Sequence, residues 1–288
     1  MSHIHYIERI NQAIDYIHKN LHKNLTVEEI ADHCCFSRFY FNRMFKAVIN
    51  ESVYSFIKRR KLENAAFLLR AKRDLTITDI ALRVGYSPSN FASAFKEHYG
   101  ISASEYRKTN DIPLKEPYLE VAEYIQNLKK RKDSFDFVNA KVNIRKIGPL
   151  NLFYERFIGH YSDLSDFWGA FCEKVIEKQM VGQDISFIGI SYDDPLITNE
   201  NRCIYDVCIN IKNTRGANVH IIKEGYYACY EFHDQLTNLA KAYNELFSLW
   251  LSYCGYDLDN RFPLEIYKSD LDEQGRMKVD ICLPIIKD

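Results

Sequence analysis

The chain of 288 residues is 47% hydrophobic and 27% charged with a formal net charge of −1, which predicts two soluble globular domains and excludes disordered and collagen-like classes. No apolar stretch approaches the ~20 residues that span a bilayer, and the N-terminus lacks signal-peptide regions, so we expect a cytoplasmic protein. The charge is unevenly distributed: residues 1–110 hold 17 Lys and Arg against 11 Asp and Glu (+6), and the remainder holds 21 against 28 (−7). This asymmetry favours a polyanionic partner for the first half alone.

The first elements expected along the chain are one supporting helix and a repeated pair of shorter helices. Ile7, Ile10, Ile14, Ile17 and Leu21 recur with helical period and predict the supporting helix. The chain then repeats itself at a spacing of 50 residues. The matching positions are Leu25-Thr26 with Leu75-Thr76, Ile30-Ala31 with Ile80-Ala81, Ser37 with Ser87, Phe41 with Phe91, Phe45-Lys46 with Phe95-Lys96, and Ser52 with Ser102. A period this long indicates a duplicated supersecondary unit.

Each copy has the pattern of a helix-turn-helix motif. The expected capping residues are Thr26 with Glu29 and then Ser37 in the first copy, and Thr76 with Asp79 and then Ser87 in the second. Between the two helices, "CCF" and "VGY" supply the turn, and Gly85 suits a left-handed backbone position. A short helix, a tight turn and an amphipathic helix are typical of DNA-binding proteins.

A longer helix is expected between the two motifs, in "SVYSFIKRRKLENAAFLLRAKRD". Its apolar or packing side comes from Phe56, Ile57, Arg60, Ala65, Leu68 and Leu69, and its charge from the run Lys58 to Lys61. About 17 helical residues measure ~25 Å. With the helix widths added, this length is compatible with two adjacent major grooves ~34 Å apart. We therefore expect a monomer to read two grooves of an asymmetric site.

The second helix of the first motif contains residue types that read DNA bases. On a helix, Phe41, Met44, Phe45 and Val48 form one apolar stripe, while Arg38, Phe39, Asn42 and Arg43 lie on the other side. Arginine can pair with guanine, asparagine with adenine, and an aromatic ring can pack on a thymine methyl group. A solvated amphipathic helix would show the same pattern. The duplication, the caps and the connecting helix favour DNA.

Residues 1–110 resemble the DNA-binding domain of AraC-type transcriptional regulators, through "IADHCCFSRFYFNRMFKAVINESVYSFIKRRKLENAAFLL" and "ITDIALRVGYSPSNFASAFKEHYGISASEYRK". The resemblance places Phe39, Asn42 and Arg43 where the family's first recognition helix meets bases. The expected DNA-binding residues are Arg38, Phe39, Asn42, Arg43, Lys46, Ser87, Ser89, Asn90, Ser93 and Lys96. Cys35 and Asn50 stand where the family usually has glycine. The recognition helix of the second motif has few side chains that read bases strongly, so we expect it to contribute phosphate and shape contacts more than sequence reading.

A connector is expected over residues 111–137, with a short helix near Tyr118 to Lys130, and the secondary-structure pattern changes after it. From residue 138 onward, strand-like and helical stretches alternate. The strand-like stretches are "VNIRKIGPLNLFYERF", "ISFIGISY", "CIYDVCINI", "HIIKEGYYACYEF", "PLEIYKSD" and "KVDICLPI", and the helical ones are "DLSDFWGAFCEKVIEK" and "QLTNLAKAYNELFSLWLSY". The order strand–helix–strand–strand occurs twice, which predicts an α+β domain with a pseudo-two-fold axis.

Residues 138–288 resemble the GyrI-like effector-binding domain, through "FIGHYSDLSDFW", "YDDP", "YDVCINI", "EGYYACYEF", "LFSLWLSYCGYDL" and "PLEIY". The expected architecture is thus multidomain, with an all-α double helix-turn-helix DNA-binding domain (1–110), the connector, and an α+β GyrI-like domain (138–288). Two strand–helix–strand–strand repeats would build the latter.

Glu265 lies in an apolar strand of a domain dense in aromatic residues, and a carboxylate beside aromatic faces suits an organic cation. From the residues alone, the preferred interpretation is that the aromatics belong to the core and that Glu265 is a charge on an edge strand. The resemblance favours a ligand site. The expected ligand-binding residues are Glu265, Tyr154, Trp168, Tyr192, Tyr230, Trp250 and Tyr267.

The expected function is that of a ligand-responsive transcriptional regulator, an activator by resemblance, that binds double-stranded DNA and a small, cationic or amphipathic effector. RNA polymerase is a candidate partner. We find no GxSxG, HExxH, phosphate-binding or dinucleotide motif, so no catalytic residue is expected. A small-molecule hydrolase and a protein-sequestering module are the alternatives. The eight scattered cysteines lack the spacing of zinc ligands, so we expect reduced, mostly buried thiols, no metal and no cofactor.

Overall fold

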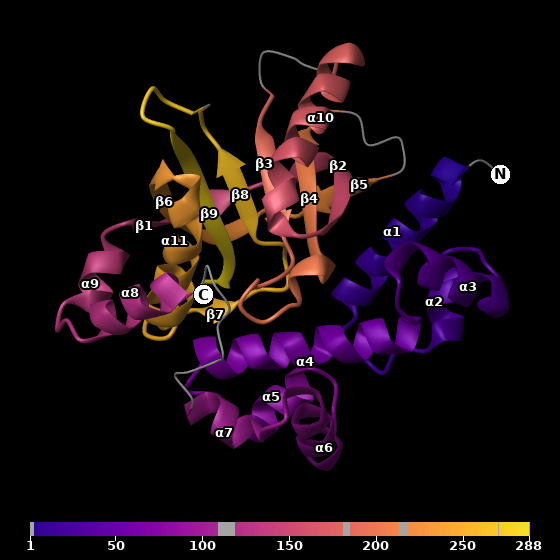
Figure 1. Cartoon of the computed structure of the whole chain (residues 1–288), viewed down its shortest axis with the longest axis horizontal. Helices are drawn as coiled ribbons and strands as arrows, with labels where there is room; N and C mark the ends of the chain where they lie inside the picture. Colours follow the sequence, from indigo (N-terminus) through magenta and orange to yellow (C-terminus); the bar gives the residue numbers. More distant parts are fainter. Residues whose placement is uncertain (1–2, 109–118, 181–184, 213–217, 270, 288) are drawn as a thin grey trace. The chain divides into compact units, whose positions relative to one another are not determined.

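The computed structural model describes residues 3–108, 119–180, 185–212, 218–269 and 271–287 (Figure 1). The chain divides into two compact units, Met1–Ile112 and Pro113–Asp288, each of which is described by itself. The expected domain limits at residues 110 and 138 stay predictions, and residues 109–118, around the start of the expected connector, lie outside the described residues. None of the described helices combines the length and the apolar content that crossing a bilayer requires.

The described part of the first unit is entirely helical, as predicted. Its helices are α1 (His3–Lys19), α2 (Val27–His33), α3 (Arg38–Ile49), α4 (Val53–Ala71), α5 (Ile77–Arg83), α6 (Pro88–Tyr99) and α7 (Ala103–Lys108). The pairs α2–α3 and α5–α6 are the two helix-turn-helix motifs, and α4 runs between them (Figure 1). The duplicated motif and the connecting helix are therefore confirmed.

The expected helix caps form at three of the four positions. The hydroxyl oxygens of Thr26 and Thr76 accept hydrogen bonds from backbone N–H groups three residues on, and of these two positions Thr76, with Asp79, completes a capping box. Ser87 caps α6 through the backbone N–H of Asn90. The prediction for Ser37 is wrong, because this residue precedes α3 without a hydrogen bond from its side chain to the helix.

The two positions where glycine is replaced have left-handed backbones. Cys35, in the turn of the first motif, has φ 56°, and Gly85 in the second motif has φ 72°. Asn50 and Gly100, after α3 and α6, have φ 58° and 76°. Asparagine tolerates this conformation well, whereas a cysteine there is strained by its Cβ atom. Glycine, which the family usually has at this position, would avoid the steric strain of Cys35.

Packing of α3 follows the predicted stripe in part. Phe41 and Phe45 are fully buried, and Ile49 continues their row at the next turn. Val48, which was expected in the core, is instead 39% exposed. The reason is that the buried row follows i, i+4 and i+8, so the last turn presents Ile49 to the core and Val48 to solvent.

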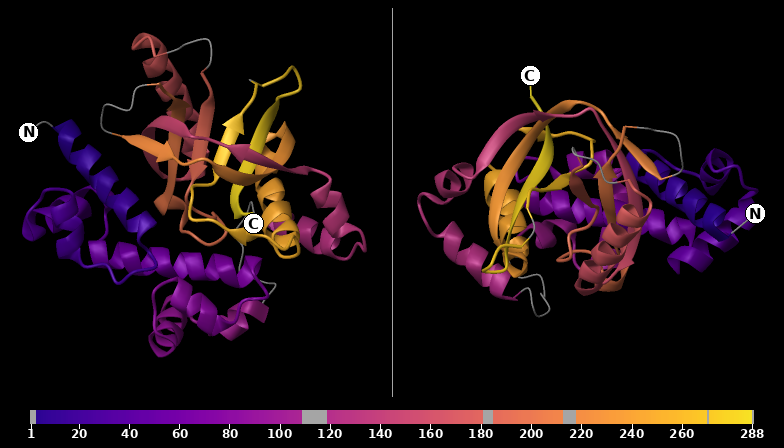
Figure 2. Two further views of the ribbon diagram at one scale, coloured as in Figure 1. Left: turned by 180° about the vertical axis from the view of Figure 1, so that it is seen from behind. Right: turned by 90° about the horizontal axis from the view of Figure 1, so that it is seen from above.

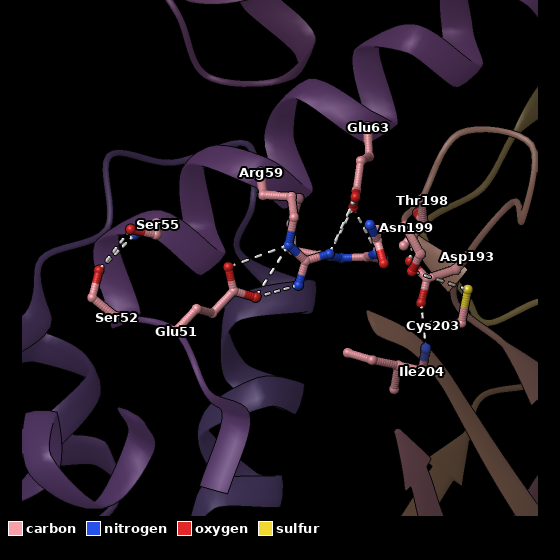
Figure 3. A network of polar contacts seen from close by, with 11 residues as sticks. Glu51, Ser52, Ser55, Arg59, Glu63, Asp193, Thr198, Asn199, Cys203 and Ile204 are labelled. Atoms are coloured by element: carbon pink, nitrogen blue, oxygen red, sulfur yellow. Dashed lines mark hydrogen bonds and ion pairs between the residues drawn. The ribbon is translucent and has the colours of Figure 1, made fainter. Parts of the chain in front are cut away.

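Three residues of the charged run of α4, Arg59 to Lys61, are buried, whereas Lys58 is half-buried. Arg59 forms hydrogen bonds with Glu51, in the loop after α3, and with Glu63 one turn further along α4 (Figure 3). Arg60 also pairs with Glu63 at 3.0 Å. Since a buried charge is tolerated only when it is paired, this network explains how four charged side chains can be buried beside the first motif.

The second unit begins with two helices, α8 (Leu119–Lys129) and α9 (Ser134–Asn139), and continues as an α+β domain. Its strands are β1 (Val142–Ile147), β2 (Leu150–Gly159), β3 (Phe187–Ser191), β4 (Cys203–Asn210), β5 (Val219–Ile222), β6 (Gly225–Gln235), β7 (Asp257–Leu258), β8 (Leu264–Tyr267) and β9 (Arg276–Ile286). The other helices are α10 (Leu164–Glu177), α11 (Leu239–Glu245), the 3₁₀ turns η1 (Tyr161–Asp163), η2 (Glu200–Arg202) and η3 (Leu236–Asn238), and the π-helical η4 (Leu246–Trp250).

The sheet confirms the two predicted repeats. The strands are antiparallel, in the order β1-β6-β9-β8-β3-β4-β2-β5, with β7 paired to β9. The repeats are β2–α10–β3–β4 and β6–α11–β8–β9, and they meet where β3 pairs with β8. Figure 2 shows the sheet curled into an arch, with α10 and α11 under its two halves. The pairing of β3 and β8 therefore lies at the pseudo-two-fold axis.

The two faces of the sheet carry different cores. One face holds an apolar cluster that includes Leu152, Tyr154, Ile188 and Leu264. The other face packs against α10 through a cluster that includes Phe157, Phe171, Tyr205 and Val207. Because side chains alternate along a strand, Glu265 lies on the face opposite Leu264, which is the face that the helices cover.

Candidate functional sites

The candidate DNA-binding residues lie at the surface of α3 and α6. All ten of them are exposed or half-buried, and Phe39 is the most open large apolar side chain of the described residues at 75% exposure. On α3, Phe41 and Phe45 fix the helix from below, so Arg38, Phe39 and Arg43 are free to face a ligand. This arrangement offers a long, partly cationic and aromatic ridge of the kind that enters a major groove.

The candidate residues of α6 have shorter polar side chains than those of α3, apart from Lys96. Ser87 accepts the backbone N–H of Asn90 as a cap, and the hydroxyl of Ser93 donates to the carbonyl of Ser89 at 3.4 Å. Two of its four candidate polar residues between 87 and 93 thus use their hydroxyls on the helix itself. Lys96, in the last turns, remains exposed.

The candidate effector site is built around Glu265 of β8, whose side chain is 3% exposed. Its Oε2 accepts hydrogen bonds from the hydroxyls of Tyr205 (2.5 Å) and Tyr267 (2.7 Å), and its Oε1 accepts one from Tyr243 of α11. Trp168 of α10 lies edge-on to Tyr267, with ring centroids 5.2 Å apart. Residues from both repeats therefore converge on one carboxylate.

The site combines a buried charge with partly open aromatic walls. Tyr243, Tyr267 and Trp168 are half-buried, whereas the carboxylate beneath them is buried. Within the part of the chain that the structure describes, no cationic side chain pairs with Glu265. The buried Nε1 of Trp168 likewise has no hydrogen-bond partner among the described residues. Among the described residues, the carboxylate of Glu265 thus has hydrogen-bond donors but no cationic partner, and the indole N–H of Trp168 has no acceptor.

The environment of the three phenols favours their neutral form. Burial, followed by the negative charge of Glu265, raises the pKa of Tyr205, Tyr243 and Tyr267 well above the usual value of 10. The three hydroxyls therefore stay protonated as donors to the carboxylate over the physiological range.

Two of the expected ligand residues, Tyr154 and Tyr192, lie elsewhere. The ring of Tyr154 stacks on His220 with centroids 4.0 Å apart. The hydroxyl of Tyr192 donates to Asp206 at 2.7 Å, and Asp206 also pairs with Arg156 and His220 at 2.7 Å each. Burial acts to raise the pKa of Asp206, but these two partners hold it below its usual value. Since Asp206 alternates with Tyr205 along β4, this cluster is on the opposite face from Glu265.

Tyr230 and Trp250 belong to a third cluster, which anchors the first helices of the unit. Glu245 of α11 accepts hydrogen bonds from Tyr230 (2.6 Å), Lys141 (2.8 Å) and Tyr124 of α8. Trp250 donates to Asn139 of α9 at 2.8 Å. Of the seven expected ligand residues, the structure thus brings together Glu265, Trp168 and Tyr267 only.

Three residues of the candidate effector site were not among those expected: Tyr205, Tyr243 and Gly189. Gly189 pairs with Glu265 across β3 and β8, and a Cβ atom added to it would lie 1.7 Å from the hydroxyl of Tyr205. A glycine inside a strand indicates close approach of a neighbouring group, which is the signal that could have found it. The internal repeat could have identified Tyr243. It follows the start of η3 by as many residues as Trp168 follows the start of η1, so the two aromatic residues occupy equivalent positions in the two repeats.

Comparison with known proteins relates each unit to a family. The family profile of the GyrI-like small molecule binding domain matches residues 140–286, about half of the chain, and a helix-turn-helix domain profile matches residues 9–109. The chain is 33% identical over 113 residues to the HTH-type transcriptional activator AarP of Providencia stuartii, which covers 38% of this chain and 83% of that protein.

A second relative shares only the first unit. The chain is 35% identical over 100 residues to the HTH-type transcriptional regulator AlkR of Acinetobacter baylyi, which covers 34% of this chain. The match spans about a third (32%) of the length of that regulator. Among solved structures, the C-terminal domain of AraT, a response regulator from Geobacillus stearothermophilus, is 32% identical and covers 39% of this chain and 95% of that one, with a TM-score of 0.35.

Proposed function

The chain belongs to the GyrI-like small-molecule binding family and carries an AraC-type helix-turn-helix domain, and from this premise we propose that it is a ligand-responsive transcriptional regulator. Its first unit binds double-stranded DNA as a monomer, and its second unit binds a small organic cation. We infer activation rather than repression from the relative that is named an activator. RNA polymerase would then be a further partner, and the protein would act in the cytoplasm.

The observation that carries the ligand class is the uncompensated charge of Glu265. A carboxylate that is buried without a cationic partner costs folding free energy, and hydrogen bonds from three neutral phenols offset only part of that cost. An organic cation would supply the missing charge and would interact with the aromatic faces of Trp168, Tyr243 and Tyr267. The unpartnered indole N–H of Trp168 supports a ligand that also carries a hydrogen-bond acceptor.

Replacement of Glu265 by Gln tests this proposal, because the amide keeps the size and removes the charge. Calorimetric titration of the full chain with a panel of aromatic cations should show affinities at least tenfold weaker in the variant. Uncharged analogues of the same shape should lose much less, since the aromatic contacts remain. Equal affinities of parent and variant for every cation, or no binding by the parent, would remove the cation from the proposal. Chemical conversion of a ligand by the parent alone would make the site a hydrolase instead.

Replacement of Arg43 by Ala tests base reading by α3. If Arg43 pairs with a guanine, the variant should lose about 1–3 kcal/mol of binding free energy on a duplex selected with the parent protein, and much less on random DNA. Fluorescence anisotropy at one fixed salt concentration measures both. The same loss on both duplexes would assign Arg43 to a phosphate contact.

A further inference from the structure

The turn of each helix-turn-helix motif is held by a cation from the helix that precedes the motif. In the first motif, Nη1 of Arg9 in α1 donates to the carbonyls of Cys34 (2.8 Å) and Cys35 (3.2 Å). The guanidinium also lies over the ring of Phe36, 5.2 Å from its centroid. The duplication is therefore wider than the sequence repeat, because it includes the supporting helix.

Lys61 of α4 has the corresponding place in the second motif. Its Nζ donates to the carbonyl of Gly85 at 3.2 Å and lies 5.4 Å from the centroid of Tyr86, the counterpart of Phe36. Unlike Arg9, Lys61 also donates to the carbonyl of Lys23 at 2.8 Å. Lys23 lies between α1 and α2, in the chain that enters the first motif. One ammonium group thus joins the entry of the first motif to the turn of the second.

The surroundings of Lys61 show a close fit at this junction. The side chain is buried, and the loss of water lowers the pKa of its ammonium group. The hydrogen bonds to the two carbonyls replace part of the lost hydration. A Cβ atom added to Gly85 would lie 2.6 Å from the carbonyl oxygen of His22 and 2.8 Å from Nζ of Lys61. The turn of the second motif therefore packs directly against the backbone that precedes the first.

We propose that Lys61 is a positioning residue that sets the spacing and the rotation between the recognition helices α3 and α6. This proposal rests on the proposed binding of DNA through both helices. Two helices that enter successive major grooves must match the helical phase of the duplex, and one inserted base pair turns the second groove by about a tenth of a turn. A fixed junction makes binding sensitive to that spacing, whereas a loose junction tolerates it.

The test compares the full chain with Lys61→Met, which keeps the apolar stem and removes the donor, and with Lys61→Gln, which keeps a donor without the charge. Lys19→Met, at an exposed position of α1, controls for the loss of one positive charge. The probes are a duplex selected from random DNA with the parent, its two half-sites alone, and a series with one or two base pairs inserted or removed between them.

For the parent and Lys19→Met, a change of one base pair should weaken binding about tenfold. For Lys61→Met, affinity for the unaltered duplex should fall about threefold to tenfold, half-site affinity should stay within twofold, and the spacing change should cost less than threefold. Lys61→Gln should fall between the two. The same spacing profile in Lys61→Met as in the parent, or an equal loss on half-sites, would overturn the positioning role. A parent that selects no DNA would instead overturn the proposed function.

Discussion

Replacement of Gly189 by Ala tests the geometry of the candidate effector site most directly. The added methyl group would lie 1.7 Å from the hydroxyl of Tyr205, 2.5 Å from its Cζ atom, and 3.1 Å from Oε2 of Glu265. No carbon atom can occupy that position, so the ring of Tyr205 must move. Because Tyr205 is buried on all sides, its movement breaks the 2.5 Å hydrogen bond to Glu265.

The expected cost follows from two contributions. A hydrogen bond to a charged group contributes about 1.5–3 kcal/mol to stability, and forcing an extra methyl group into a packed interior costs about 1–3 kcal/mol. We therefore expect the free energy of unfolding of the second unit to fall by about 3 kcal/mol or more. Both tryptophans of the chain, Trp168 and Trp250, belong to this unit, so tryptophan fluorescence during urea unfolding of the full chain reports on it alone.

Gly169→Ala is the matched control. Gly169 lies on α10, and a Cβ atom added there meets nothing within 4 Å. Alanine is favoured over glycine in a helix by about 0.5–1 kcal/mol, so this variant should be slightly more stable than the parent. The reasoning is refuted if Gly189→Ala unfolds within about 0.5 kcal/mol of the parent, or if prior removal of the Tyr205 hydroxyl by Tyr205→Phe leaves the cost of the alanine unchanged.

Two further predictions concern the left-handed turn and the buried carboxylate on the opposite face. Cys35→Gly should raise the stability of the first unit by about 0.5–1 kcal/mol, because the strain that glycine removes from the left-handed backbone outweighs the conformational entropy that it adds to the unfolded chain. Thermal unfolding followed by far-ultraviolet circular dichroism measures this gain, and Cys35→Ala should bring none. The folded pKa of Asp206 lies below its unfolded value near 3.9, so its contribution is complete above about pH 4 and is lost as the pH falls through the folded pKa. Asp206→Asn should thus cost about 3–5 kcal/mol at pH 7 and clearly less at pH 3, and a cost independent of pH would contradict this assignment.

The helices and their repetition could be predicted from sequence because they depend on local signals. A period of 50 residues, helical spacing of apolar residues and capping patterns sufficed for α2 to α6. The charged run of α4 was not interpretable in that way. Whether Arg59 is solvated or buried depends on Glu51, which the turn after α3 brings back to it. The exposure of Val48 likewise depends on tertiary packing and not on the period of the helix.

The candidate effector site could be predicted only in part, because aromatic density does not determine which face of a sheet a ring occupies. Tyr267 lies two residues after Glu265 and so shares its face, a relation that is visible in the sequence. Tyr205 reaches Glu265 through the pairings β4–β3 and β3–β8, which are long-range and unpredictable from one chain. The same uncertainty placed Tyr154 and Tyr192 with Glu265, whereas the register puts them across the sheet.

Helix α11 joins the candidate effector site to the cluster that anchors α8. Tyr243, which binds Glu265, and Glu245, which holds Tyr124 of α8, are two residues apart on this helix. Immediately afterwards the helix becomes π-helical over Leu246–Trp250, where each backbone hydrogen bond spans five residues instead of four. Because Tyr243 and Glu245 lie on one short helix, a shift of α11 that moves the first side chain also moves the second, and with it the contact to Tyr124 of α8.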